Sequence, residues 1–343
     1  MNARQLLYSA IRLLPVSVSR PIIQQYRSWR DSISLLRASR YDRITFSRFS
    51  GLYAVKRREQ LEGRLLKNYH RLEKGLALPN PRPGFGKAVA EEVLNDLHDY
   101  IQAFGPARVA SAAIHALEEY AGFLDSTGFS SEWLRSRLIA FHSSGRECGH
   151  TEGGTREVDR SLLQATLPAD VSAFMRSRHS VRHFAPGPIE ITLIENAVRA
   201  AQYAPSVCNR QSGHVFLVKD PTKQRALLQL QNGNSGFGSE SGALLVVTSA
   251  LDTFLTVGER YQPWIDGGLF GMSLLHALHG LGLGACALNW SVEPATDRAF
   301  KRLSGVPDNH RIMFLIAAGH LLPRFRVAAS ARRELAEVLH IIE

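Results

Sequence analysis

The sequence predicts an α+β fold in which a helical N-terminal region precedes a β-sheet covered by helices on both faces. In the first half of the 343 residues, apolar side chains recur at helical spacing. In the second half, apolar runs of strand length alternate with helical or loop segments, and two of these runs are apolar almost throughout. Strands of that kind are buried on both faces, so the sheet is expected to lie between layers of helices.

The helical half is clearest over residues 88–104 and 109–124, where positions such as Val93, Leu97 and Leu117 fall on one face. Three prolines and two glycines in residues 78–86 predict a loop before these helices. The polar, glycine-rich segment 142–157 predicts a domain boundary. We therefore expect a helical region over residues 1–165, to which the sequence assigns no role, and a second domain over residues 166–343.

The second domain is expected to begin with a helix whose apolar residues, Ile191, Leu193, Ile194, Ala197 and Ala201, face inward. Strands are predicted over residues 214–220, 243–251, 285–291 and 311–320. Residues 265–288 are long enough to span a membrane, but acidic, histidine and glycine residues interrupt them. A buried helix followed by a buried strand accounts better for that stretch.

The formal net charge of +10 is concentrated in an arginine-rich arm within residues 1–60. Such an arm can bind nucleic acid, an anionic membrane surface or an acidic partner. The alternative is a solvated helical face, which is favoured because no nucleic-acid-binding module accompanies the arm. A nucleic-acid partner is thus disfavoured, and peripheral membrane contact by residues 1–60 stays an open alternative.

Three widely spaced cysteines form neither a disulfide framework nor a metal knuckle, and they predict a reducing, cytoplasmic setting. His70 and Glu73 are expected on one helical face, but two ligands fall short of the three that a metal site usually needs. No metal is therefore predicted.

Two short motifs carry candidate chemistry. Arg178, Ser180 and Arg182 alternate along a basic stretch, and guanidinium groups suit bidentate contacts to phosphate, although an exposed basic connection would look the same. Asn209 and Gln211 alternate on the run into a strand, so both amides are expected to point the same way. Together they can read the edge of a pyrimidine-like ring; the alternative is a hydrogen-bonded turn.

The same strand alternation would place Cys208 on the face opposite the two amides, as a packed thiol.

Two further segments are less specific. The glycine-rich loop 230–241 carries one large apolar residue, Phe237, and is either a lid over a site or a plain connection. Arg332 and Arg333 add positive charge before a predicted amphipathic C-terminal helix.

Taken in chain order, these motifs resemble the nitroreductase family of flavin enzymes, from about Met175 to the C-terminus. "RHSVRHF" is similar to the opening flavin motif, "APSVCNRQ" to the proline-serine-x-x-asparagine-x-glutamine motif, and "DGGLFGMSLLHALHGLGLGACALNWS" to the central helix and following strand. "IAAGH" and "SARRELAEVL" resemble the last strand and final arginine. The resemblance implies a mixed or antiparallel sheet flanked by helices, and a homodimer that binds FMN at its interface.

The resemblance also implies the cofactor-binding residues. The arginine–serine segment is expected to hold the ribityl chain and phosphate, Asn209 the pyrimidine edge, and residues 287–290 a backbone N–H near the flavin N5. An arginine near the C-terminus is expected to reach the phosphate from the partner subunit. No catalytic side chain is expected, since the flavin carries the chemistry. The implied set is Arg178, His179, Ser180, Arg182, Pro205, Ser206, Asn209, Gln211, Leu288, Asn289, Trp290, Arg332 and Arg333, with Phe237 as the lid.

The sequence departs from the family pattern at Ser212-Gly213, where many members have Pro-Trp, and at Ser330, where many have lysine. The first change is expected to enlarge the pocket and the second to shift phosphate binding toward the first motif. Gly267 and Gly271 lie one helical turn apart, either against a partner helix in a dimer, which the resemblance favours, or in tight packing within one chain. "HRLEKGL" with "RPGFG" resembles an extension of members encoded near polysaccharide genes.

The implied activity is that of an FMN-dependent oxidoreductase that takes hydride from NADH or NADPH and passes electrons to a small organic acceptor by ping-pong chemistry. The acceptor class is open among nitroaromatics, quinones, enones and biosynthetic intermediates. Two alternatives stand beside it: a flavin-dependent oxidase or dehydrogenase of a biosynthetic substrate, and a non-catalytic flavin-binding scaffold in polysaccharide synthesis.

Overall fold

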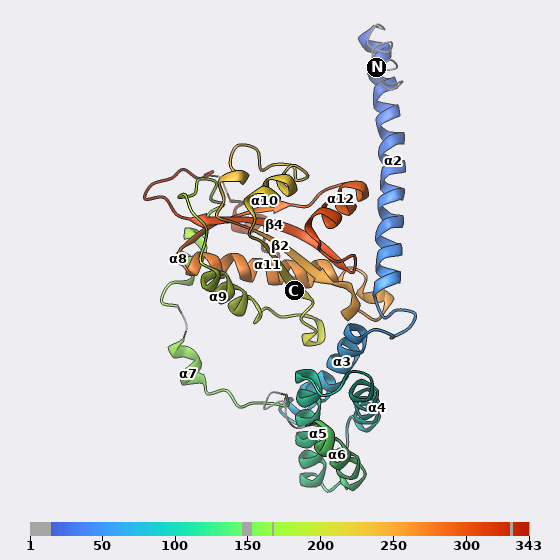
Figure 1. Cartoon of the computed structure of the whole chain (residues 1–343). Coiled ribbons are helices and arrows are strands. Elements are labelled where there is room, and N and C mark those ends of the chain that lie inside the picture. The colour runs from blue at the N-terminus through green and yellow to red at the C-terminus, as the bar shows by residue number, and fades with distance from the viewer. Residues whose placement is uncertain (1–14, 146–152, 167, 330–331, 343) are drawn as a thin grey trace.

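A computed structural model describes residues 15–145, 153–166, 168–329 and 332–342. The order of the major elements confirms the α+β class: helices occupy the N-terminal part of the chain, and strands occur in the C-terminal part among further helices. Figure 1 shows the sheet region beside the long helix α2, with a helical bundle below both. No helix among the described residues combines the length and apolarity needed to cross a bilayer.

The N-terminal part consists of one long helix and a bundle with its own apolar core. Leu65, Leu97, Leu117 and Leu134 are fully buried in that core, one from each bundle helix. Within α4, for example, the buried residues Val93, Leu94 and Leu97 recur at helical spacing, so the helix buries one face. The helices are α2 (Val16–Phe49), α3 (Arg58–Leu76), α4 (Lys87–Phe104), α5 (Arg108–Ser126) and α6 (Glu132–Gly145).

Two short helices, α7 (Arg160–Ala165) and α8 (Val171–Ser177), lead to the sheet. Within the described residues, four strands form one antiparallel sheet in the order β1-β2-β4-β3. Because β2 and β4 are the central strands, they are the most apolar, as predicted. The strands are β1 (Gly213–Val218), β2 (Ala243–Ala250), β3 (Leu283–Asn289) and β4 (His310–His320).

Helices cover both faces of the sheet (Figure 1). On one face, α9 (Ile191–Ala201) and α11 (Gln262–Gly280) pack against Leu245, Val247 and Ile316. On the other, α10 (Pro221–Leu228) and α12 (Pro294–Ser304) pack against Val246 and Leu315. The two apolar faces of β2 and β4 are thus both buried, which is why those strands read as continuous apolar runs.

Three details differ from the sequence prediction. Ile191, expected to face inward, is 43% exposed, because α9 starts there and only its later turns reach the sheet. The C-terminal amphipathic helix is a single 3₁₀ turn, Leu335–Glu337, with exposed side chains. Gly267 and Gly271 face the sheet, where a Cβ would meet Met313 and Phe314, so they serve packing within the chain.

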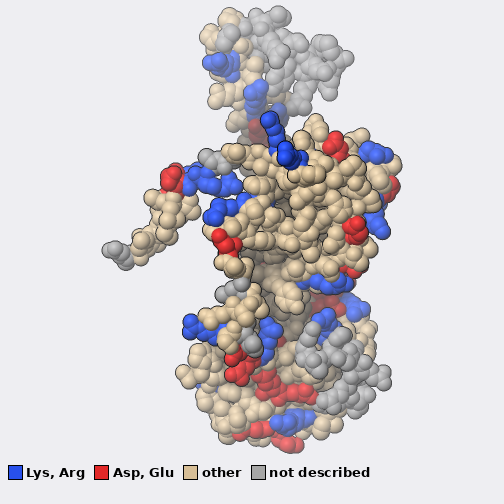
Figure 2. Space-filling model, turned by 90° about the vertical axis from the view of Figure 1, so that its left-hand side faces the viewer, with Lys and Arg blue, Asp and Glu red and all other residues tan. Residues whose placement is uncertain are grey.

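The long helix α2 joins the sheet region directly. The Tyr41 hydroxyl donates to Asp297 Oδ2 at 2.6 Å, and Arg311 Nη1 lies 2.9 Å from Asp42 Oδ1. Phe46 packs in a small core with residues that follow β2. In the face seen in Figure 2, Lys and Arg side chains gather on the sheet region, and several Asp and Glu side chains lie together on the bundle.

Candidate functional site

The predicted phosphate-binding segment lies along the edge of β3. Ser180 forms a parallel bridge with Ala285, and the Val181 N–H donates to the Ala285 carbonyl at 3.0 Å. Val181 is 4% exposed and anchors the segment in the core. The flanking residues, Arg178 and Arg182, remain half-buried and exposed respectively, so their guanidinium groups stay available beside the strand.

The same strand edge presents backbone donors. Because the Ala285 carbonyl points away from β4, strand alternation also turns the N–H groups of Ala287 and Asn289 away from β4. The side chain of Gln231 reaches this edge and donates to the Asn289 carbonyl at 3.0 Å. Leu288 is 3% exposed, so its side chain belongs to the core rather than to the edge.

Trp290 follows the strand and is held in place from two sides. Its indole N–H donates to Asp297 Oδ1 at 2.8 Å, and its ring packs edge-on against Phe300 at 4.5 Å between centroids. Asp297 in turn accepts from Tyr41 of α2. Burial disfavours the charged form of Asp297, but the nearby Lys301 ammonium and these hydrogen bonds outweigh it and lower its pKa.

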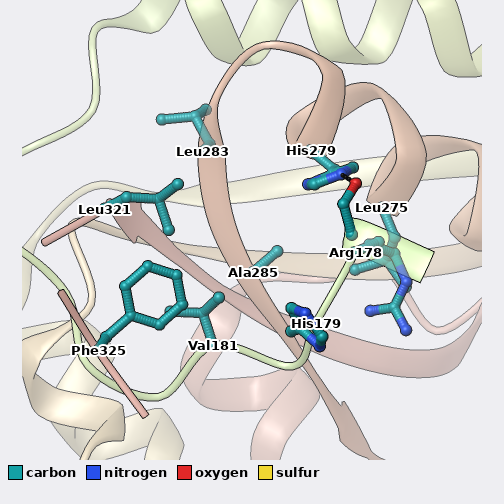
Figure 3. Close-up of a pocket in the computed structure, with 10 residues that line it drawn as sticks. Arg178, His179, Val181, Leu275, His279, Leu283, Ala285, Leu321 and Phe325 are labelled. Carbon is teal, nitrogen blue, oxygen red and sulfur yellow. Dashed lines mark hydrogen bonds between the residues drawn. The ribbon is translucent and has the colours of Figure 1, made fainter. Parts of the chain in front are cut away.

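A small hollow of about 40 Å³ lies beside the arginine segment and is lined by Arg178, His179 and His279 (Figure 3). The Ser177 hydroxyl lies 2.7 Å from His279 Nε2. Burial lowers the pKa of His279 and of His276, and the Arg178 charge lowers both further. The Arg178 guanidinium therefore makes one side of this largely apolar hollow positive, which favours an anion over a cation.

The amide motif adopts a turn and not the start of a strand. Cys208, Asn209 and Gln211 have left-handed φ angles of 49°, 51° and 50°, and β1 begins only at Gly213. The prediction that the two amides point the same way by strand alternation, with the thiol on the other face, was therefore wrong in its reasoning. The Gln211 N–H instead donates to the Ser206 hydroxyl at 2.9 Å, and Asn209 is exposed.

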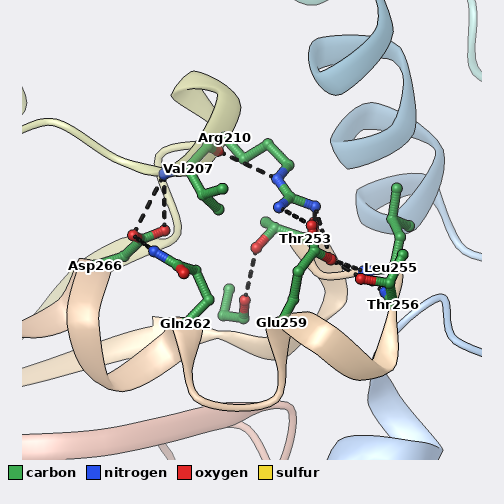
Figure 4. A network of polar contacts seen from close by, with 9 residues as sticks. Val207, Arg210, Thr253, Leu255, Thr256, Glu259, Gln262 and Asp266 are labelled. Carbon is green, nitrogen blue, oxygen red and sulfur yellow. Dashed lines mark hydrogen bonds and ion pairs between the residues drawn. The ribbon is translucent and has the colours of Figure 1, made fainter.

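A buried ion pair holds this turn (Figure 4). Arg210 Nη2 lies 2.5 Å from Glu259 Oε1, and its Nη1 donates to the Thr253 carbonyl at 2.8 Å. Burial disfavours the charged form of Glu259, but the hydrogen bonds from Arg210 and from backbone N–H groups outweigh it and lower its pKa. Asp266 accepts from the Val207 N–H at 3.2 Å and fixes the start of the turn.

The two predicted halves of the site lie at opposite edges of the sheet. The arginine segment runs beside β3, and the amide turn leads into β1, at the other end of the strand order. Three strand spacings of about 4.8 Å put these edges roughly 14 Å apart. Pro205, Ser206 and Gln211 line their own pocket of about 290 Å³, so the chain by itself does not bring the two halves together.

The remaining predicted residues have varied positions. Phe237 is 6% exposed within the core, with the Arg182 guanidinium 5.8 Å from its ring centroid; its role as a lid stays a prediction. Arg332 is exposed, and Arg333 Nη1 lies 3.6 Å from Glu337 Oε1. Ser330 lies outside the described residues.

The departure at Ser212-Gly213 has a structural reason. Ser212 is fully buried and accepts a hydrogen bond from the Ser249 hydroxyl at 3.0 Å. A Cβ at Gly213 would lie 2.5 Å from the Phe270 ring, so that ring fills the place next to the glycine. Gly213 and Phe270 both line the 290 Å³ pocket, whereas Ser212 lies in the core.

Sequence reasoning missed Arg210, Glu259, Asp266 and His279. Arg210 stands between the two amides of the motif, and no local pattern separates a buried arginine from an exposed one. Asp266 did carry a signal, because a carboxylate in an apolar helix needs a partner when it is buried. Burial raises its pKa, against the effect of the Gln262 amide and the Val207 N–H.

Comparison with known proteins identifies the sheet region. Residues 175–320 match the model of the nitroreductase family. These residues form a nitroreductase-family domain. Among curated proteins, an NADH dehydrogenase of Thermus thermophilus is 27% identical over 106 residues, which are 31% of this chain and 52% of that protein. The match thus spans about half the length of that relative.

A second relative, named as an NADH dehydrogenase/NAD(P)H nitroreductase of Archaeoglobus fulgidus, is 27% identical over 148 residues, which are 42% of this chain and 81% of that protein. Among solved structures, an FMN-dependent nitroreductase of Clostridium difficile aligns with a TM-score of 0.42 and 20% identity, over 49% of this chain and 96% of its own. The helical region before residue 175 lies outside the family match.

Proposed function

We propose that the chain is an FMN-dependent NAD(P)H oxidoreductase that works as a homodimer and reduces a small organic acceptor. The observation that carries the proposal is the split donor set of the nitroreductase-family domain: guanidinium groups and free backbone N–H groups at the β3 edge, and amide groups at the β1 edge. The names of the two curated relatives, an NADH dehydrogenase and an NADH dehydrogenase/NAD(P)H nitroreductase, support a nicotinamide reductant.

The residues present fit FMN in their chemistry. Arg178, which lines the hollow, and the exposed Arg182 suit the phosphate. The N–H groups of Ala287 and Asn289, which point away from β4, suit the flavin ring nitrogen and oxygen atoms. Asn209 is exposed on a rigid turn and offers both donor and acceptor to a pyrimidine edge.

In this site the chain's own residues would bind and orient the flavin. The bound flavin would supply the hydride and electron transfer. The arginine segment would hold the phosphate, and the Asp297 carboxylate keeps the Trp290 ring beside the end of β3. The nicotinamide and the acceptor would occupy the same cavity one after the other. That order is the ping-pong order expected when two substrates share one cavity.

A homodimer would bring the two halves of the site together. The face of α11 that points away from the sheet carries Ile265, Leu269 and Met272, which are 52%, 43% and 38% exposed. Gly268 lies among them, and a Cβ built there meets no atom within 4 Å. An exposed apolar stripe with a glycine suits close contact with the same helix of a second copy.

A complementation experiment tests the shared site. Arg178→Ala and Asn209→Ala variants are purified, and each is expected to lose the flavin absorption bands of the wild-type protein. Refolding the two variants together should restore about a quarter of the wild-type flavin content, because half of the randomly paired dimers carry one site free of both changes. The restored fraction should also regain NAD(P)H oxidation with a quinone or a nitroaromatic compound.

Two results would overturn the proposal. A wild-type protein that is colourless and takes up no FMN on reconstitution would exclude the cofactor. Flavin loss in both variants with no recovery on mixing would place the arginine and amide groups in one chain's site and exclude the shared arrangement.

A further inference from the structure

A large pocket separate from both halves of the flavin site lies where the N-terminal region meets the nitroreductase-family domain. It has a volume of about 540 Å³, within the range of ligand sites. Its walls come from α2, the segment after α2, the start of β4, and the turn that precedes and opens α11. We name it the junction pocket and define it by Arg43, Tyr53, Arg260, Tyr261, Trp264 and Arg311.

Aromatic rings converge on the junction pocket and stay uncovered. Tyr53 is 79% exposed, Tyr261 62% and Trp264 46%. Single exposed apolar residues are ordinary on a protein surface, but three rings around one hollow are a stacking surface for a planar molecule. They come from two separate parts of the chain, so the fold, and not one sequence motif, assembles this surface.

The pocket is also positively charged. Three arginines line it against one carboxylate, Asp42. Arg311 is 7% exposed and already pairs with Asp42 at 2.9 Å, while its guanidinium lies 5.7 Å from the Trp264 ring centroid. The Arg260 guanidinium lies over the Tyr261 ring, 4.4 Å from its centroid, so a cation and a ring lie together in the pocket wall.

From this combination we infer that the junction pocket binds an aromatic anion, and that a nucleoside diphosphate is the class that fits it. The base would stack on Tyr261 and Trp264, and the phosphates would pair with Arg43 and Arg260. The inference does not rest on the proposed flavin chemistry, since the pocket shares no lining residue with the arginine hollow or the amide pocket. It assigns the N-terminal region a part in ligand binding.

The test is calorimetric titration of the full chain, purified with whatever flavin it carries, using ADP and UDP as probes. One equivalent of nucleotide should bind per chain. Adenosine, which has the ring without the charge, and pyrophosphate, which has the charge without the ring, should each bind at least about tenfold more weakly.

Arg260→Ala, which removes a phosphate partner, and Tyr261→Ala, which removes a stacking ring, should each weaken nucleotide binding by about tenfold or more. Both side chains are exposed, so the fold should not change, and circular dichroism checks this. The matched control is Arg302→Ala, an exposed arginine on α12 outside the pocket, which should bind like the wild type.

Three outcomes would overturn the inference. The first is the absence of a binding signal for both nucleotides at millimolar concentrations. The second is pyrophosphate binding as tight as ADP binding, which would make the pocket a simple anion site. The third is binding that survives Arg260→Ala but is lost in Arg178→Ala, which would place the nucleotide in the hollow beside β3.

Discussion

Replacing Arg210 by methionine should disrupt the amide turn while leaving the sheet intact. The side chain of Arg210 is fully buried, and its partner Glu259 is 14% exposed. The guanidinium makes one ion pair with Glu259 and donates to the carbonyls of Val207 and Thr253 at 3.2 and 2.8 Å. Methionine keeps much of the length of the side chain and removes all of these bonds.

The expected cost follows from these contacts. Removing one partner of a buried ion pair leaves the other charge uncompensated and costs about 3–5 kcal/mol of unfolding free energy. The turn also holds three non-glycine residues in left-handed conformations, each of which costs about 1 kcal/mol or more. Without the guanidinium bonds the turn should relax out of these conformations, and Asn209 should move away from its present position.

Urea unfolding measures the loss of unfolding free energy. Titration of the refolded, flavin-free protein with FMN measures the effect of the displaced turn on flavin affinity. In Arg210→Met/Glu259→Gln the uncompensated charge is gone, so part of the stability should return, but the turn still lacks its bonds and flavin affinity should stay low. Arg199→Met, which removes an exposed arginine paired with Glu195, should change stability by less than about 0.5 kcal/mol. An Arg210→Met protein as stable as the wild type, or a double variant with fully restored flavin affinity, would refute the reasoning.

Two further predictions concern the core and the domain junction. Burial lowers the pKa of His310 to about 3, so the folded protein keeps the ring neutral while the unfolded chain takes up a proton below about pH 6.5. The free energy of unfolding should therefore decrease as the pH falls. In urea titrations between about pH 7 and pH 5, the wild type should lose about 2 kcal/mol more than His310→Gln. The exposed control His98→Gln should follow the wild type. Gly63→Ala should destabilise the protein by about 1–3 kcal/mol in the same assay, because its Cβ would lie 2.9 Å from Thr253 Cα. Gly122→Ala, whose Cβ meets no atom within 4 Å, should be neutral or stabilising. Equal effects of the two glycine changes would contradict the close packing of Gly63 against Thr253.

Much of the fold could be predicted because apolar spacing reports burial directly. The strands began and ended within two residues of their predicted bounds, and the helix-then-strand interpretation of residues 265–288 is confirmed by α11 and β3. The C-terminal helix failed for a physical reason. Leu335, Val338 and Leu339 have the spacing of a helix, but they are 72%, 65% and 56% exposed, and helices of that length need packing to be stable.

The amide turn could not be predicted, because distant residues determine its conformation. The groups that bind Arg210 lie 43 and 49 residues further along the chain. Strand alternation was a reasonable default for residues that lead into β1, but the buried ion pair forces the left-handed conformations instead. The position of the arginine segment along the edge of β3 could not be predicted either, because it depends on a backbone contact with Ala285, and its role in phosphate binding stays a prediction.

The junction explains why residues outside the family match bear on the site within it. Gly63 of α3 lets the helix backbone approach Thr253, and the carbonyl of Thr253 accepts the hydrogen bond that positions Arg210. One residue before, Asp252 is 1% exposed and forms an ion pair with Arg57, which also lies before the family match. Burial raises the pKa of Asp252, so its charge depends on that arginine and on Asn309. The helical region and the amide turn are therefore parts of one packed structure, and a change in the packing of α3 reaches Asn209 through a single intervening loop.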